Sequence, residues 1–401
     1  MDSPLALPLG ARLDDYEIER LLSSDGSFSM VYIANDRRRE RVAARQQMLQ
    51  QRLADWRRAD GPLGYAAQVE VAPSAGPRVA IKEFFPSEMA QRRSGGQTVV
   101  PRTGQDKLYA WSRGRFLDEA KFLLQHAHPN VVAVFEVLSA NNTEYMVMEL
   151  LDGGSLESQV SSGAGRSEAG VRRWLLPVLR GLQSTERGGV DHLDLSPQNI
   201  VFRSRGGEPV LIDFGAARMS AESRTGGTQL IVNNGYSAPE KYHVTSRGLT
   251  ARADVYAIGA LINFALTGER PASAMGRDAG TGLDAAAQAA RSGRASPRFL
   301  AAVDQCFQLD PRRRPADAAA TERVFAPWGD APTPGPAAPH GVMFPLVEPV
   351  DDTEPARRRR VYILFFALLA LLLLLLVIGP ALAAVTPASS DHTFTGDRRG
   401  D

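Results

Sequence analysis

Apolar and polar residues follow two different periods along this chain. Short runs that alternate apolar with polar residues, or are apolar throughout, predict strands at 16–18, 30–34, 131–137 and 145–150. Apolar residues spaced three to four apart predict helices at 113–127, 171–187, 251–267, 283–292 and 297–308. Because the strands precede most of the helices, the pattern predicts an α+β fold with a small strand-rich lobe and a larger helical lobe.

A basic helix is predicted within the first group of strands. Between residues 37 and 58, Val42, Leu49, Leu53 and Trp56 fall on one helical face and arginines cover the rest. The pattern is typical of a surface helix with a solvated charged side. It also suits a helix that contacts a partner or an anionic lipid surface, and the sequence leaves both interpretations open.

The end of the chain has a different composition. Residues 361–378 are apolar without interruption, and Gly379-Pro380 and a further apolar stretch to residue 385 follow. Eighteen helical residues cover about 27 Å, close to the hydrocarbon thickness of a bilayer, and a soluble core helix of this length would not have leucine on every face. Arg357 to Arg360 precede the stretch, which predicts a single-pass helix in the cell inner membrane with everything before it cytoplasmic.

Composition narrows the class of protein. With 401 residues the chain has room for a sizeable core, and its net charge of +1 gives no argument for a nucleic-acid partner. The single cysteine, Cys306, excludes a disulfide within the chain, and its apolar neighbours indicate a small core residue. The first twelve residues lack the pattern of a signal peptide.

Charged residues in and near the predicted strands suggest a site for phosphates. Lys82 directly follows the apolar run Val79-Ala80-Ile81, and an ammonium buried in such a strand requires an anionic partner. ATP phosphates would serve, and Glu119, on the helix that follows, is the candidate carboxylate from the protein. Asp118 is one position round that helix and should point elsewhere.

A second group of residues supplies acid–base and metal-binding chemistry. Asp194 is the candidate partner of an acceptor hydroxyl, which it would orient and deprotonate. Asn199 and Asp213 offer the hard oxygen ligands that Mg²⁺ prefers. His192 precedes this group and is assigned a bracing role in the loop.

These motifs together make the chain resemble a bacterial serine/threonine protein kinase of the eukaryotic-like type over residues 16 to about 325. The motifs are Val79–Lys82, His192-Leu193-Asp194 with Asn199, Asp213-Phe214-Gly215, Ser237-Ala238-Pro239-Glu240, Asp254–Gly259 and Asp310–Pro315. Lys82-Glu83-Phe84-Phe85-Pro86 is similar to a bacterial subgroup in which the lysine strand runs into a Phe-Phe-Pro segment. The resemblance implies a two-lobed kinase fold that uses ATP and Mg²⁺.

The resemblance also assigns roles by position. It implies Lys82, Glu119 and Asp194 in catalysis, and Asn199 and Asp213 as metal ligands. It places ATP against Ser24, Gly26, Val31, Ala80, Lys82, Met148, Glu149 and Leu151, with Met148 as the gatekeeper and the adenine edge against the backbone near Glu149 and Leu151. His192, Glu240, Asp254 and Arg314 are implied as structural residues, with Arg314 paired to Glu240. Ser220, Ser223, Thr225 and Thr228 are candidate autophosphorylation sites in the activation segment.

The expected organisation follows from these positions. Residues 1–14 form an N-terminal segment and 15–326 the kinase domain, with lobes at 15–150 and 151–326 and an insertion at 37–77. A Pro-rich and basic linker spans 327–360, the membrane helix 361–385, and a short extracytoplasmic tail 386–401. The expected partners are ATP, protein substrates and the membrane; whether the chain forms a dimer stays open.

The chain departs from the kinase pattern in places. The phosphate-covering loop, Ser24 to Ser29, keeps one of three glycines, Gly26. Leu193 replaces an arginine that pairs with a phosphorylated activation loop, so activity should not depend on such phosphorylation. Ser196 stands where a lysine supports the transferred phosphate, and Asn233 stands where a threonine tethers the catalytic aspartate. Losing that lysine costs a rate factor of about a hundred or more.

Two other functions fit part of the pattern. The degraded loop and Ser196 favour a pseudokinase scaffold, whereas the retained Lys82, Asp194 and Asp213 favour an active enzyme. A small-molecule kinase of the aminoglycoside-phosphotransferase type would also have the His-x-Asp loop, but it would lack the motifs at 237–240, 254–259 and 310–315.

Overall fold

The computed structural model describes residues 5–24, 28–38, 41–45, 47–48, 50–51, 77–93, 96–163, 165–214, 233–242, 249–277, 288 and 291–325. All of them belong to one compact unit, Met1–Gly329. The predicted linker, membrane helix and tail (327–401) and the candidate phosphorylation sites lie outside the described residues. Within the described ranges, none of the helices has both the length and the apolar character needed to span a bilayer.

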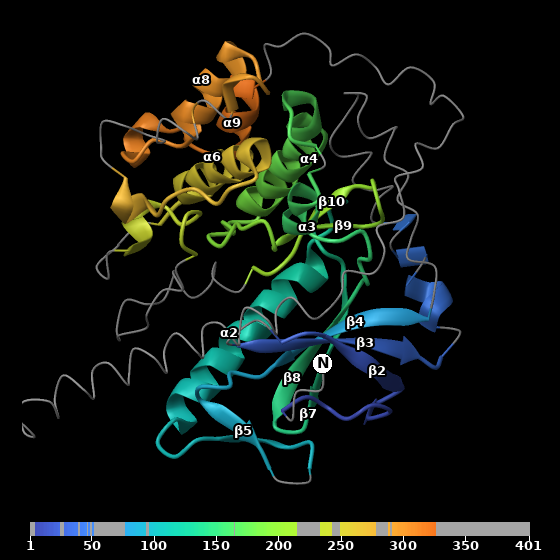
Figure 1. Ribbon diagram of the computed structural model, residues 1–401. Helices are drawn as coiled ribbons and strands as arrows, with labels where there is room; N and C mark the ends of the chain where they lie inside the picture. Colours follow the sequence, from blue (N-terminus) through green and yellow to red (C-terminus); the bar gives the residue numbers. More distant parts are fainter. Residues whose placement is uncertain are drawn as a thin grey trace, which may run out of the picture. The chain divides into compact units, whose positions relative to one another are not determined.

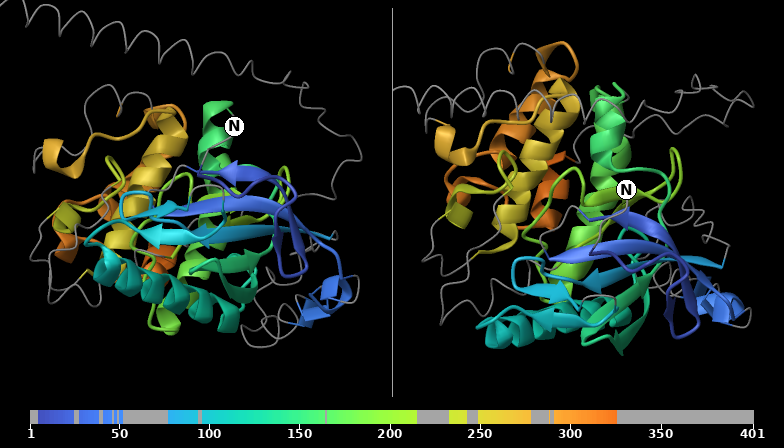
Figure 2. Two further views of the ribbon diagram at one scale, coloured as in Figure 1. Left: turned by 90° about the horizontal axis from the view of Figure 1, so that it is seen from below. Right: turned by 60° about the horizontal axis from the view of Figure 1, so that its bottom comes forward.

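One antiparallel sheet organises the first half of this unit. Its strands are β1 (Arg12–Leu13), β2 (Tyr16–Ser23), β3 (Ser29–Asp36), β4 (Arg78–Phe84), β7 (Val134–Ala140) and β8 (Thr143–Met148), in the order β1-β2-β3-β4-β8-β7. Helix α2 (Asp106–Gln125) runs along the sheet beside β7 and β8 (Figures 1 and 2). β4 is therefore a central strand, hydrogen-bonded on both sides, and all of its residues after Arg78 are buried.

Helices make up most of the second half. They are α3 (Leu156–Ser161), α4 (Glu168–Arg187), α6 (Ala251–Thr267), α8 (Pro297–Cys306) and α9 (Ala318–Phe325), with 3₁₀ turns η2 (Pro239–Tyr242), η3 (Ala274–Gly276) and η4 (Pro311–Arg313). A short ladder, β9 (Ile200–Phe202) with β10 (Pro209–Leu211), lies beside α4 (Figure 1).

Helix α6 is the centre of the helical core. Every residue from Ala253 to Leu266 is buried, and α4, α8 and α9 pack around it. A Cβ added at Gly259 would meet the Cβ of Phe307 at 2.9 Å, so glycine allows the close approach of α6 to the end of α8. The Thr250 side chain caps the first turn, and Gly268 ends the helix at φ 82°.

The predicted strand and helix pattern is confirmed in outline. α4 and α6 lie where helical spacing placed them, and the small strand-rich lobe precedes the helical one. α2 begins at Asp106, seven residues before its predicted start, because its first turn is mostly polar and exposed. The two-stranded ladder of β5 (Ala90–Arg92) and β6 (Val99–Pro101) was not predicted, since three-residue strands have too little periodicity to detect.

In the insertion, residues 41–45, 47–48 and 50–51 are described and are helical as predicted, but Arg41 and Arg45 are not simply solvated. Arg45 is buried and lies 2.5 Å from Asp36, and Arg41 reaches Glu136 at 3.1 Å. Both guanidinium groups lie over the ring of Tyr16. These arginines therefore attach the helix to the sheet. Leu49, Leu53 and Trp56 lie outside the residues whose side chains are described.

Candidate active site

Lys82 is held between two carboxylates. It lies on β4, where its neighbours across the sheet are Val31 and Met146. Its Nζ lies 3.3 Å from Glu119 Oε1 and 3.1 Å from Asp213 Oδ1, and its side chain is 9% exposed. Burial alone would lower the pKa of Lys82, but the two carboxylate charges outweigh burial and raise it, so the amine is cationic. Glu119 is the carboxylate expected beside Lys82, and Asp213, expected as a metal ligand, contacts the same amine.

Glu119 joins this ion pair to the Asp-Phe-Gly turn. It lies on α2, is 2% exposed, and its Oε1 also accepts the backbone N–H of Phe214 at 3.1 Å. The Phe214 ring packs on His192, with 4.4 Å between ring centroids. Asp118 points elsewhere, as expected, and pairs with Arg115 on its own helix.

The loop that carries Asp194 is hydrogen-bonded to helix α6. Asp254 accepts the backbone N–H groups of His192 and Leu193 at 2.8 and 2.7 Å. Leu193 has φ 60°, an uncommon conformation for a branched side chain that costs about 1–2 kcal/mol. The His192 ring contacts the Ile212 carbonyl oxygen at 3.0 Å, and burial lowers its pKa, so the ring is neutral. These contacts fit the bracing role assigned to His192 and the structural role assigned to Asp254.

The two candidate metal ligands project from one end of the β9–β10 ladder. Ile200 pairs with Leu211, so Asn199 and Asp213 flank that pair, and the Ile212 N–H donates to the Asn199 carbonyl at 3.0 Å. The Asn199 Nδ2 donates to the Asp194 carbonyl at 2.8 Å, which leaves its Oδ1 as the ligand atom. The Asp213 side chain is 43% exposed. A carboxylate and an amide oxygen beside a cationic amine fit a magnesium–phosphate group.

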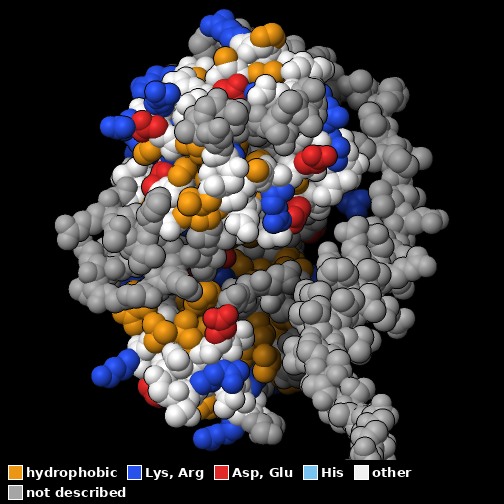
Figure 3. All heavy atoms as spheres, turned by 60° about the vertical axis from the view of Figure 1, so that its left-hand side comes forward, with side chains coloured by type: hydrophobic (Ala, Val, Ile, Leu, Met, Phe, Trp, Pro, Cys, Tyr) orange, Lys and Arg blue, Asp and Glu red, His pale blue; other side chains and the backbone are white. Residues whose placement is uncertain are grey.

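The residues assigned to ATP line the sheet near Lys82. Ala80 is buried and pairs with Met148 on β8, while Val31 and Leu151 are partly exposed and Ser24 is exposed at the end of β2. Gly26 lies outside the described residues. On the face drawn in Figure 3, apolar side chains gather at mid-height around a hollow.

Glu149 has a further role that the sequence did not suggest. Its carboxylate is 3% exposed and pairs with Arg203 at 3.0 Å, and it also accepts the N–H of Ala133. Its own N–H donates to the Ala133 carbonyl. The backbone group of Glu149 that remains to meet an adenine edge is therefore its carbonyl.

Arg314 and Glu240 form the predicted pair. The two guanidinium nitrogens of Arg314 lie 2.7 and 3.0 Å from the two Glu240 oxygens, in the bidentate geometry that suits this pair. The Arg314 side chain has no exposed surface. The pair connects η2 to the segment that follows η4.

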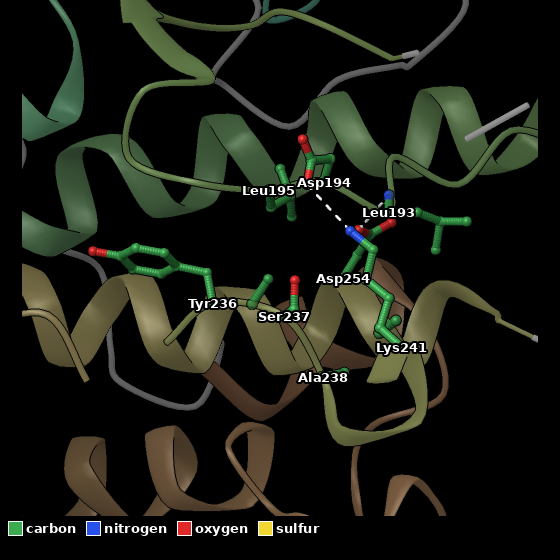
Figure 4. A pocket seen from close by; sticks show the side chains of 10 residues that line it. Leu193, Asp194, Leu195, Tyr236, Ser237, Ala238, Lys241 and Asp254 are labelled. Atoms are coloured by element: carbon green, nitrogen blue, oxygen red, sulfur yellow. Dashed lines mark hydrogen bonds and ion pairs between the residues drawn. The ribbon is translucent and has the colours of Figure 1, made fainter. Parts of the chain in front are cut away.

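Two residues in contact with Asp194 complete the site. Asn233 Nδ2 donates to Asp194 Oδ1 at 2.9 Å, so asparagine does make the tether expected of a threonine. Lys241 Nζ lies 3.2 Å from the same oxygen (Figure 4). The sequence did not predict a role for Lys241. Its rarity was a signal, because the chain has four lysines and 42 arginines.

The chain is similar to known proteins over most of the described residues. Residues 88–328, more than half of the chain, match the family model described as "Protein kinase domain". The chain is 26% identical over 249 residues to "Serine/threonine-protein kinase PkaA" of Streptomyces coelicolor, which covers 60% of this chain and 45% of that protein. It is 29% identical over 249 residues to "Serine/threonine-protein kinase C" of Synechocystis, and the aligned region covers 59% of this chain and 45% of that protein.

A solved structure shares the fold. The structure "PpkA-294 apo form" superposes with a TM-score of 0.60 at 24% identity, over 80% of this chain and 99% of that one. The chain spans less than half the length of the curated relatives named above.

Proposed function

The chain belongs to the protein kinase family, and we propose that it transfers the γ-phosphoryl group of ATP to serine or threonine side chains of proteins. The observation that supports this most is the convergence of Lys82 with Glu119 and Asp213. A lysine held in place by a buried carboxylate and an exposed aspartate can bind triphosphate oxygens without reorganising, which is how such sites stabilise transferred phosphate.

The transfer uses few groups. The acceptor hydroxyl oxygen forms a bond to the γ-phosphorus, the bond from that phosphorus to the β–γ bridging oxygen breaks, and ADP leaves with the electron pair. Asp194 orients the hydroxyl and takes its proton. Lys82 neutralises charge on the nucleotide phosphates, and Asn199 and Asp213 would hold Mg²⁺. When bound, the metal neutralises charge on the β- and γ-phosphates.

A membrane location is part of the proposal. Its support is the apolar run 361–385 and the four arginines before it, which together favour a single-pass helix with the kinase domain in the cytoplasm. Alkaline extraction of cell membranes should leave the full chain in the pellet. A variant without 361–385 should appear in the supernatant, and an intact chain that is extracted would remove this part of the proposal.

The second candidate is a pseudokinase scaffold, favoured by the loss of two glycines from the phosphate-covering loop. The purified full chain separates the two functions when incubated with radiolabelled ATP, Mg²⁺ and casein. Label in the chain or in casein, lost in Asp194→Asn with an unchanged melting temperature, supports the enzyme. A melting temperature raised by Mg-ATP without any transfer supports the scaffold, and no response to Mg-ATP by either measurement contradicts the enzyme.

A further inference from the structure

The catalytic loop lacks a lysine where the protein kinase pattern has one, and Ser196 stands at that position. Ser196 is buried, and its carbonyl accepts the N–H of Asn199, so it has a structural place in the loop but no charge. Asp194 nevertheless has a cation beside it. Lys241 lies on η2, which follows the activation segment in the sequence. Its Nζ points at the Asp194 carboxylate (Figure 4).

The position of Lys241 is well defined by the fold. Its backbone N–H donates to the Ala238 carbonyl at 2.9 Å, and the preceding residue, Glu240, is fixed by Arg314. The Lys241 side chain is 3% exposed. Burying an ammonium is costly unless a charge compensates it. Among the described residues, Asp194 is the carboxylate within ion-pair distance of Lys241.

The residue type is also informative. The chain has 42 arginines and four lysines, of which Lys107 and Lys121 are exposed on α2 while Lys82 and Lys241 pair with acidic residues of the site. An ammonium is a compact point charge, whereas a guanidinium is a wide planar fork. A lysine at 241 therefore places a single compact charge beside one carboxylate oxygen, which the wider fork of an arginine would not do.

We propose that Lys241 is a positioning residue that supplies, from the segment after the activation loop, the positive charge that Ser196 does not supply. Both Lys241 and Asn233 bind Oδ1 of Asp194. This arrangement fixes the carboxylate and leaves Oδ2 to orient the acceptor hydroxyl and receive its proton. The loss of a catalytic-loop lysine is then compensated within the same chain. The proposal rests on the proposed kinase function.

The experiment measures kcat, the KM for ATP and the melting temperature of the full chain. The variants are Lys241→Met, Lys241→Arg, Ser196→Lys and the double variant of Ser196→Lys with Lys241→Met. Lys107→Met, which removes an exposed lysine from α2, is the matched control and should match wild type. All rates are taken at temperatures where each variant is folded.

Lys241→Met should lower kcat by about 10- to 100-fold, because an electrostatic contact at the reacting group is lost, and should leave the KM for ATP nearly unchanged. Lys241→Arg keeps the charge in a poorer shape and should retain an intermediate rate. A lysine at 196 should restore most of the kcat lost in Lys241→Met. If Lys241 only stabilised the fold, a lysine at position 196 would not restore the kcat lost in Lys241→Met.

A kcat for Lys241→Met equal to that of wild type overturns the proposal. So does a loss of kcat that the double variant fails to restore, provided that Ser196→Lys alone is folded and active. If Ser196→Lys alone is inactive, equal rates for Lys241→Arg and Lys241→Met overturn the role, and a faster Lys241→Arg supports it. Absence of transfer by wild type is a different result, which removes the proposed function and this role with it.

Discussion

A single oxygen of Glu119 contacts both Lys82 and the backbone N–H of Phe214, at 3.3 and 3.1 Å. The ion pair that positions the lysine is therefore coupled to the placement of the Asp-Phe-Gly turn. Moving α2 away from the sheet would break both contacts at once. Glu119 therefore joins α2 to the segment that carries Asp213, alongside the direct contact between Lys82 and Asp213.

Glutamine and alanine at position 119 should separate the two contacts. Glu119→Gln keeps an oxygen acceptor for Phe214 but removes the charge beside Lys82, and should lower kcat/KM for ATP by about 10- to 100-fold. Glu119→Ala removes both contacts and should lower kcat/KM further. Steady-state kinetics at varied ATP check this. Asp118→Asn is the control, because among the described residues Asp118 pairs with Arg115 on its own helix and not with Lys82, and equal rates for all three variants would contradict the role of Glu119.

Two arginines of the Asp310–Pro315 motif, Arg314 and Arg312, differ in burial, which predicts unequal losses of stability on mutation. Arg314 has a fully buried side chain, pairs with Glu240 and donates to the carbonyls of Gln308, Leu309 and Arg252. Arg314→Ala removes the donor that the buried guanidinium gives to these acceptors and to the carboxylate, and should lower the free energy of unfolding by about 3–5 kcal/mol.

Arg312 provides the matched control for that variant. Its side chain is 88% exposed and pairs with Asp310 at the surface. Arg312→Ala should therefore leave the free energy of unfolding close to that of wild type. Urea denaturation of both variants checks the contrast, and equal losses of stability would show that burial of the Arg314 pair does not determine its contribution.

The sequence predicted those site residues that lie in recognisable motifs. Lys82, Glu119 and Asp213 lie in or beside motifs of the kinase pattern, so the resemblance implied that they come together. Lys241 was missed because it lies 47 residues from Asp194 in a 3₁₀ turn with no periodic pattern. The role of Glu149 was missed for a similar reason, since its partner Arg203 follows a strand of three residues.

His128 makes stability depend on pH. It is buried, its Nδ1 accepts the N–H of Asn130, and burial lowers its pKa to about 3, with the charges of His126, Arg187 and Arg180 adding to the effect. The unfolded chain, with an ordinary histidine pKa near 6.5, binds more protons between pH 3 and 6.5. The stability from this group is therefore complete above about pH 6.5 and is lost as the pH falls toward 3.

From pH 7.5 to pH 5, His128 should reduce the free energy of unfolding by about 2 kcal/mol. Denaturation of wild type and His128→Asn at both pH values isolates this term, because other titrating groups contribute equally to the two proteins. The variant should lose about 2 kcal/mol less than wild type over that range. Parallel pH profiles would mean that His128 is protonated in the folded chain.

The Phe-Phe-Pro segment after Lys82 predicts a second stability contrast. Glu83, the residue next to Lys82, has no exposed surface and accepts the hydroxyl groups of Tyr32 and Tyr145 at 2.8 and 2.9 Å. Arg92 lies 2.5 Å from the same carboxylate and stacks over the ring of Phe85. The segment therefore turns Arg92 back onto the strand that carries Lys82.

Arg92→Met removes the cation and leaves the Glu83 carboxylate buried, which should cost about 3–5 kcal/mol of unfolding free energy. Adding Glu83→Gln to that variant should recover part of the loss, because the two tyrosines can still donate to a neutral amide. Arg93→Met, at the exposed neighbouring position, should change stability by less than about 0.5 kcal/mol. Urea denaturation of the four proteins measures these differences. A double variant no more stable than Arg92→Met would show that Arg92 acts through its contact with Phe85 and the Leu5 and Gln97 carbonyls, and not by compensating Glu83.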